Sequence, residues 1–173
     1  MRTIKSLTIL LALLFAGLAA RAQYTSDYTV VTGDPEQKTV WKGACTFDDL
    51  NKVSDFKLQE ASAVYKPEIS VIKQLSKQLE GCEVIIFLGT WCEDSHRIIP
   101  QLYRVLKDTG YPFDKLRMIA LDRDKKSGGD LEKKCNVTHV PAIIVMKDGM
   151  EKGRITETVE STVEGDLLHI TRP

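Results

Sequence analysis

The chain is 173 residues long, which fits one domain, and its 24 basic and 24 acidic side chains balance each other. No basic run interleaved with aromatic residues occurs, so the composition argues against binding to nucleic acid or to a membrane surface. The four cysteines lack zinc-ligand spacing and the three histidines are scattered, so we expect neither a metal site nor a cofactor.

The first segment has the pattern of a signal peptide. Arg2 and Lys5 are basic, and an apolar run follows over residues 7–20. This run is too short to cross a bilayer comfortably, and the Ala-Arg-Ala triplet that ends at Ala22 fits the small-x-small rule for signal peptidase. We therefore expect residues 1–22 to be removed, leaving a periplasmic or extracellular protein without a membrane span. The alternative is an uncleaved anchor.

Residues 23–66 are expected to form an N-terminal extension that is mainly helical. Turn signals stand at Gly33-Asp34-Pro35, and one short strand is expected near residues 39–41. Thr46 with the acids after it indicates a helix start, and residues 54–65 could form a second helix. The extension has no motif from which a role follows.

Residues 67–173 alternate between helical and strand patterns. A strand–helix–strand unit implies parallel pairing with a right-handed crossover, and an Asp-Gly pair at 148–149 indicates a closing antiparallel hairpin. We expect an α/β fold with a mixed four-stranded sheet and helices on both faces. The expected helices cover about 67–80, 93–107, 130–135 and 159–170, and the expected strands about 84–88, 116–121, 143–146 and 151–156.

A tryptophan-cysteine pair follows the first of these strands, and a hydrophobic-proline pair comes later in the chain. The first segment reads Trp91-Cys92-Glu93-Asp94-Ser95 and opens a helix; the second, Val140-Pro141, precedes a strand and the hairpin. This ordered set resembles the thioredoxin superfamily, whose active site is Trp-Cys-x-x-Cys at that place. The resemblance covers about residues 67–170 and implies a thioredoxin-like fold. The longer segment around Cys92 is similar to an exported bacterial branch.

Cys92 is the candidate nucleophile, because a thiolate is favoured by the unpaired amide groups and dipole at a helix start. Ser95 could donate a hydrogen bond to the sulfur, and His96 lies four residues on, on the same helix face. Glu93 and Asp94 oppose the thiolate by their charge. We expect the helix start and Ser95 to outweigh them.

Two departures from the resembled family bear on mechanism. Ser95 stands where the second cysteine is usual, and a serine cannot resolve a mixed disulfide. We therefore expect Cys92 to work as a single thiol on protein or small-molecule thiol and disulfide clients, as an isomerase or reductase whose adducts an external thiol reductant resolves. Ile86 stands where many members carry a buried acid, so a general acid–base group is missing.

The resemblance also assigns roles around the cysteine. It implies that Trp91 shields the nucleophile and that Pro141 follows a cis peptide bond. It further implies that the backbone of Val140 pairs with an extended client segment, as an added strand would. An ordinary turn before a strand is the alternative for Val140-Pro141.

The remaining cysteines leave several alternatives open. Cys135, six residues before Pro141, is a candidate resolving thiol, and a Cys45–Cys82 disulfide is a further alternative. A Cys82–Cys92 bond is not expected, because the strand between them separates them along the sheet. Buried free thiols are the first expectation for Cys82 and Cys135.

Two kinds of function remain. The first is monothiol thiol–disulfide exchange in the cell envelope, and the second is a non-catalytic module that docks a partner at Val140-Pro141. The retained Trp91-Cys92 pair favours the first. A cluster-sharing role like that of monothiol glutaredoxins is disfavoured, because Glu93-Asp94 does not resemble their motif.

Overall fold

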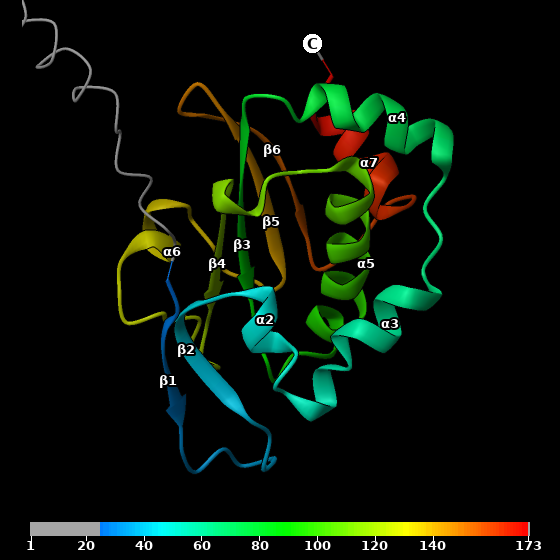
Figure 1. Ribbon diagram of the computed structural model, residues 1–173. Coiled ribbons are helices and arrows are strands. Elements are labelled where there is room, and N and C mark those ends of the chain that lie inside the picture. Colours follow the sequence, from blue (N-terminus) through cyan, green and yellow to red (C-terminus); the bar gives the residue numbers. More distant parts are fainter. Residues whose placement is uncertain (1–24, 173) are drawn as a thin grey trace, which may run out of the picture.

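The computed structural model describes residues 25–172, so the expected signal peptide lies outside the described residues. One sheet and its helices make up the fold (Figure 1). The strands are β1 (Asp27–Val31), β2 (Val40–Cys45), β3 (Cys82–Leu88), β4 (Leu116–Ala120), β5 (Ala142–Lys147) and β6 (Met150–Thr156). The helices are α2 (Phe47–Leu50), α3 (Leu58–Val64), α4 (Ile69–Gln78), α5 (Glu93–Thr109), α6 (Leu131–Lys134) and α7 (Val163–Ile170), with 3-10 turns η1 (Ser54–Phe56) and η2 (Phe113–Lys115).

The sheet has six strands in the order β1-β2-β4-β3-β5-β6. Strands β3 and β4 are parallel, and every other neighbouring pair is antiparallel. The expected four strands are β4, β3, β5 and β6, so the mixed α/β class is confirmed. The strand number was wrong, because β2 adds to the free edge of β4 and β1 adds to β2.

The N-terminal extension is therefore not mainly helical. It contributes β1 and β2 as well as α2 and α3. The expected helix over residues 54–65 is divided, since Lys57 has a positive φ of 46° between η1 and α3. Thr46 does begin a helix, and its side chain and that of Asp49 form a reciprocal capping box.

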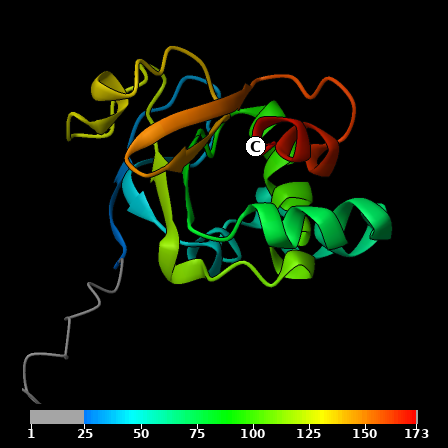
Figure 2. The same cartoon turned by 90° about the horizontal axis from the view of Figure 1, so that it is seen from above.

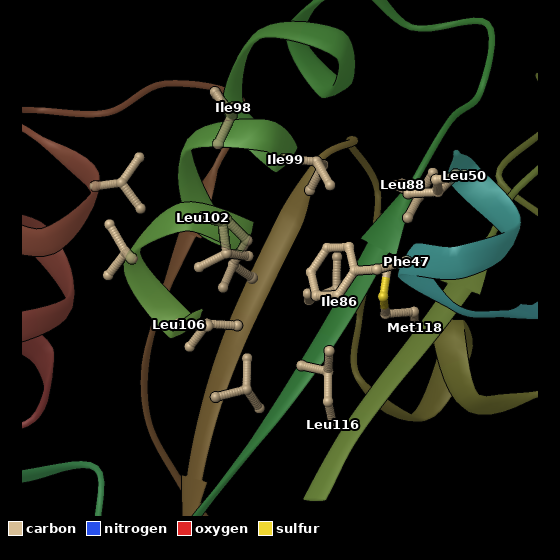
Figure 3. Close-up of a cluster of buried hydrophobic side chains, with 14 of the residues drawn as sticks. Phe47, Leu50, Ile86, Leu88, Ile98, Ile99, Leu102, Leu106, Leu116 and Met118 are labelled. Atoms are coloured by element: carbon tan, nitrogen blue, oxygen red, sulfur yellow. The ribbon is translucent and has the colours of Figure 1, made fainter. Parts of the chain in front are cut away.

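The two faces of the sheet are covered unequally. Helices α4, α5 and α7 lie together on one face, and α6 lies on the other (Figure 2). Strand β3 is buried on both faces: Ile86 belongs to the helix-side core, and Ile85 and Phe87 belong to a smaller cluster on the opposite side. This explains the unbroken apolar run in the sequence. Figure 3 shows the larger cluster, in which side chains of β3 and β4 meet those of α5 and α2.

The polypeptide bends sharply at the carboxyl end of β3, where α5 begins. Within residues 25–172, no helix is long and apolar enough to cross a membrane. The extension reaches this end of the sheet too, since β2 pairs with β4 through Gly43 and Ala120. Strands β2, β4 and β3, which are distant from one another in sequence, thus lie side by side at the end of the sheet where α5 begins.

Candidate active site at the start of α5

Cys92 is the N-cap residue of α5, with extended backbone angles of φ −90° and ψ 124°. Its N–H donates to the carbonyl of Gly89 at 3.0 Å, and its carbonyl accepts from the N–H of His96 at 3.1 Å. The side chain is half-buried. The sulfur therefore belongs to a partly exposed residue at the positive end of a helix 17 residues long.

The sulfur of Cys92 lies next to the later hydrophobic-proline pair. Its thiol donates to the Val140 carbonyl at 3.3 Å, and the Val140–Pro141 peptide bond is cis. Cys92 and Trp91 pack against the cluster that holds Val140 and Phe87. The two motifs, 48 residues apart in sequence, form one site.

Ser95 does not bond to the sulfur, contrary to the sequence-based expectation. Its side chain is fully buried, and its hydroxyl accepts a hydrogen bond from the N–H of Gly89 at 3.2 Å. This hydrogen bond therefore links the first turn of α5 to Gly89, the residue that follows β3. Ser95 positions the turn and does not contact the reacting atom.

His96 also has other partners than the sulfur. Its Nε2 donates to the carbonyl of Thr90 at 2.6 Å, and its ring lies against Phe56 with centroids 4.6 Å apart. The imidazole of His96 therefore bonds to the backbone of the turn and not to the sulfur. The imidazole ring of His96 thus stabilises the backbone between β3 and α5.

The two acids after Cys92 are paired with cations. Glu93 lies 3.4 Å from the ammonium of Lys38 and is 89% exposed. Asp94 pairs with Arg97 at 2.7 Å. Solvent and these partners screen both carboxylates, which reduces their effect on a negative sulfur.

Trp91 covers the side of the site that faces the loop after β4. Its indole N–H donates to the carbonyl of Leu121 at 2.9 Å, and Arg123 and Lys125 each lie 5.0 Å from its ring. A Cβ on Gly89 would lie 2.8 Å from this ring. Glycine at position 89 is thus what lets the indole fold back beside Cys92.

Several residues at the site were not found by sequence reasoning. Lys38 donates to the backbone carbonyl of Trp91 at 3.4 Å, and Asp34 binds the guanidinium of Arg123, with one contact at 3.1 Å. The hydrogen bond from Arg123 is the main cause that lowers the pKa of Asp34 to about 2. All of these contacts join the β1–β2 loop to the site, and the only signal for them was the Gly33-Asp34-Pro35 turn.

The other three cysteines are less able to act as nucleophiles. All four thiols are free. Burial raises the pKa of Cys45 to about 12, and burial is also the main cause that raises the pKa of Cys82 and of Cys135. A raised pKa means a smaller fraction of thiolate at these three sulfurs.

The alternative Cys45–Cys82 disulfide does not fit the strand register. Cys45 pairs with Met118, which pairs with Ile86. Ile86 is four residues from Cys82 along β3, which places the two cysteines roughly 13 Å apart along the sheet. Cys82 and Cys92 lie at opposite ends of β3, as expected.

The part of the chain that the structure describes holds no group of three or more histidine, cysteine, aspartate or glutamate side chains that could bind a metal ion. His139 is exposed beside Val140 and lies 4.0 Å from Glu157.

The family model described as Thioredoxin matches residues 67–167. A thioredoxin from Echinococcus granulosus is 28% identical over 101 residues, covering 54% of this chain and 89% of the relative. Among solved structures, Fasciola hepatica thioredoxin is 21% identical with a TM-score of 0.38, covering 57% of this chain and 86% of that one. Mitochondrial thioredoxin 3 from Saccharomyces cerevisiae is 29% identical with a TM-score of 0.34, covering 45% and 69%.

Proposed function

The chain belongs to the thioredoxin family, and from that premise we propose that it carries out thiol–disulfide exchange in the cell envelope with Cys92 as its single nucleophile. Family membership supports the general thiol–disulfide redox role. The monothiol mechanism and the envelope location go beyond what family membership supports, and we propose them on other grounds. The observation that carries the proposal is the placement of a half-buried Cys92 sulfur at the start of α5, 3.3 Å from the Val140 carbonyl.

The first step is attack on a client disulfide. The thiolate of Cys92 bonds to one client sulfur, the client S–S bond breaks, and the other client sulfur leaves as a thiolate that takes a proton from solvent. The helix start favours the negative sulfur before attack. The backbone at Val140 and Pro141, both buried in the free protein, is the edge with which an extended client segment would pair.

The second step needs an external thiol. A low-molecular-weight thiolate, or a thiolate of a reduced partner protein or of the client itself, attacks the client sulfur of the Cys92–client disulfide, forms a new disulfide with it and releases Cys92 as a thiolate. The total number of disulfide bonds is unchanged. Ser95, whose buried hydroxyl stands where a second cysteine is usual and cannot resolve a mixed disulfide, supports this external route.

The envelope location rests on the signal-peptide pattern of residues 1–22. An oxidising compartment supplies disulfide clients, which agrees with the proposed reaction.

The experiment is to look for disulfide-linked adducts of the protein in envelope extracts after alkylation of free thiols. Wild-type protein is expected to form adducts that a reductant dissolves, and Cys92→Ser protein is expected to form none. Cys135→Ser protein is the matched control and should keep the wild-type pattern, because Cys135 takes no part.

Two outcomes contradict the proposal. If wild-type protein forms no adducts, the alternative of a non-catalytic module that docks a partner at Val140-Pro141 is favoured. If adducts accumulate only in the Cys135→Ser protein, Cys135 resolves them and the mechanism is not monothiol.

A further inference from the structure

The residues Gly89-Thr90-Trp91-Cys92 between β3 and α5 form what we call the reactive turn. Thr90 is buried within this turn, with 2% of its surface exposed, and its side chain contacts the N-terminal extension. Its hydroxyl donates to the carbonyl of Thr39 at 2.6 Å and accepts from the N–H of Trp41 at 3.0 Å. One hydroxyl thus satisfies both a donor and an acceptor of the extension backbone at the start of β2.

The same turn is held on its other side by α5. The carbonyl of Thr90 accepts from His96, and the N–H of Gly89 donates to Ser95. The extension supplies a rigid anchor for these contacts, because Trp41 is buried and stacks on Tyr28 with ring centroids 4.1 Å apart. The residues just before Cys92 are therefore bonded to two elements that are far apart in sequence.

We propose that Thr90 is a positioning residue, through which the N-terminal extension fixes the direction in which the start of α5 presents the Cys92 sulfur. The extension is then a part of the reactive site and not an appended segment. This inference rests on the proposed role of Cys92 as the nucleophile.

The test is the rate at which iodoacetamide alkylates Cys92, followed by peptide mass spectrometry at fixed pH. Thr90→Val removes the hydroxyl and leaves the Thr39 carbonyl and the Trp41 N–H without their partner. The alkylation rate is expected to change by about fivefold or more, because losing two buried hydrogen bonds shifts the turn. Thr90→Ser keeps the hydroxyl and is expected to stay within about twofold of the wild-type rate.

Thr171→Val is the matched control, because Thr171 is also buried and its hydroxyl bonds to Gln78 and Leu167, at the far end of α7. It should lower the free energy of unfolding without changing the alkylation rate. Equal rates for Thr90→Val and wild type would overturn the inference, as would equal changes in the Thr90 and Thr171 variants. Because alkylation needs no client, a failed adduct experiment would contradict the proposed function and leave this result standing.

Amide hydrogen exchange on the wild-type protein covers the case in which Thr90→Val does not fold. The N–H of Trp41 is expected to be protected to the same degree as the paired amides of β2. Exchange at the rate of an unstructured amide would overturn the inference.

Discussion

The reactive turn requires glycine at position 89, because a side chain there would collide with the ring of Trp91. The indole of Trp91 occupies the space that a Cβ at position 89 would need, and its N–H is held by the Leu121 carbonyl. The N–H of Gly89 also donates to the Ser95 hydroxyl, and its carbonyl accepts from the N–H of Cys92. A larger residue at position 89 would therefore disturb several contacts at once.

Replacing Gly89 with alanine is expected to lower the free energy of unfolding by about 1–3 kcal/mol, because the added methyl group must displace a ring that is held in place. Urea denaturation measures this change. Gly129→Ala is the matched control, since the nearest atom to its added Cβ, the Oγ of Ser127, is 3.5 Å away. Equal stabilities of the two variants would rule out the proposed clash.

At this scale, the sequence predicted which residues gather but not how each side chain turns. Cys92 does lie beside Val140, as the resemblance implied. The contact expected of Ser95 was wrong, because helical spacing sets only the face of a side chain. Local partners, the Gly89 amide and the Thr90 carbonyl, then decide its direction.

The helices and strands could be predicted where the hydrophobic pattern is long and regular. Strands β3 and β4 and helix α5 were found for this reason. Pairing across distant sequence could not be predicted in the extension: Cys45 lies beside Met118, and nothing local to β2 indicates that neighbour. The result was a sheet wider than expected.

Glu164 of α7 connects three elements of the helical face. This carboxylate is buried, accepts from the hydroxyl of Tyr65 at 2.6 Å, and accepts from the N–H of Glu68 at 3.1 Å just before α4. Burial, and then the bond to Glu164, raises the pKa of Tyr65. The end of the extension is thereby fixed to the last helix of the fold.

Tyr65→Phe is expected to lower the free energy of unfolding by about 1–2 kcal/mol, because a buried carboxylate loses a donor. Thermal or urea unfolding at neutral pH provides the measurement. Tyr103→Phe serves as the control, since the hydroxyl of Tyr103 makes no hydrogen bond with the residues that the structure describes. A loss as large in the control as in Tyr65→Phe would mean that the hydroxyl bond contributes nothing.

Across the whole molecule, the extension is joined to the reactive site by charge as well as by the sheet. The β1–β2 loop places Asp34 on Arg123 and Lys38 on Glu93, and Arg123 in turn lies over the Trp91 ring. The β1–β2 loop of the extension is therefore held to the reactive turn by ion pairs and by the contact of Arg123 with the Trp91 ring. The domain boundary expected near residue 66 separates segments that share one sheet and one core.

Asp34 makes part of this connection dependent on pH. Its pKa is about 2 in the folded protein, against about 3.9 in an unfolded chain. The unfolded state therefore binds more protons between these values, so the contribution to stability is present above about pH 4 and is lost as the pH falls toward about 2. Asp34→Asn should reduce stability at neutral pH and flatten its dependence on pH in that range.

Urea denaturation at a series of pH values measures this slope. Asp130→Asn is the control, because Asp130 pairs with Lys134 on the surface, where both side chains are about two-thirds exposed. A slope for Asp34→Asn that equals the wild-type slope would contradict the assigned role of the Arg123 pair.

In the proposed function, one sulfur, that of Cys92, carries the chemistry. Intact-protein and peptide mass spectrometry of the protein, expressed from its full chain and exposed to glutathione disulfide, tests this proposal. We expect a chain that begins at Gln23 and carries a single reducible glutathione adduct on Cys92. An intramolecular disulfide that includes Cys92, or a Cys92 that takes no adduct, would contradict it.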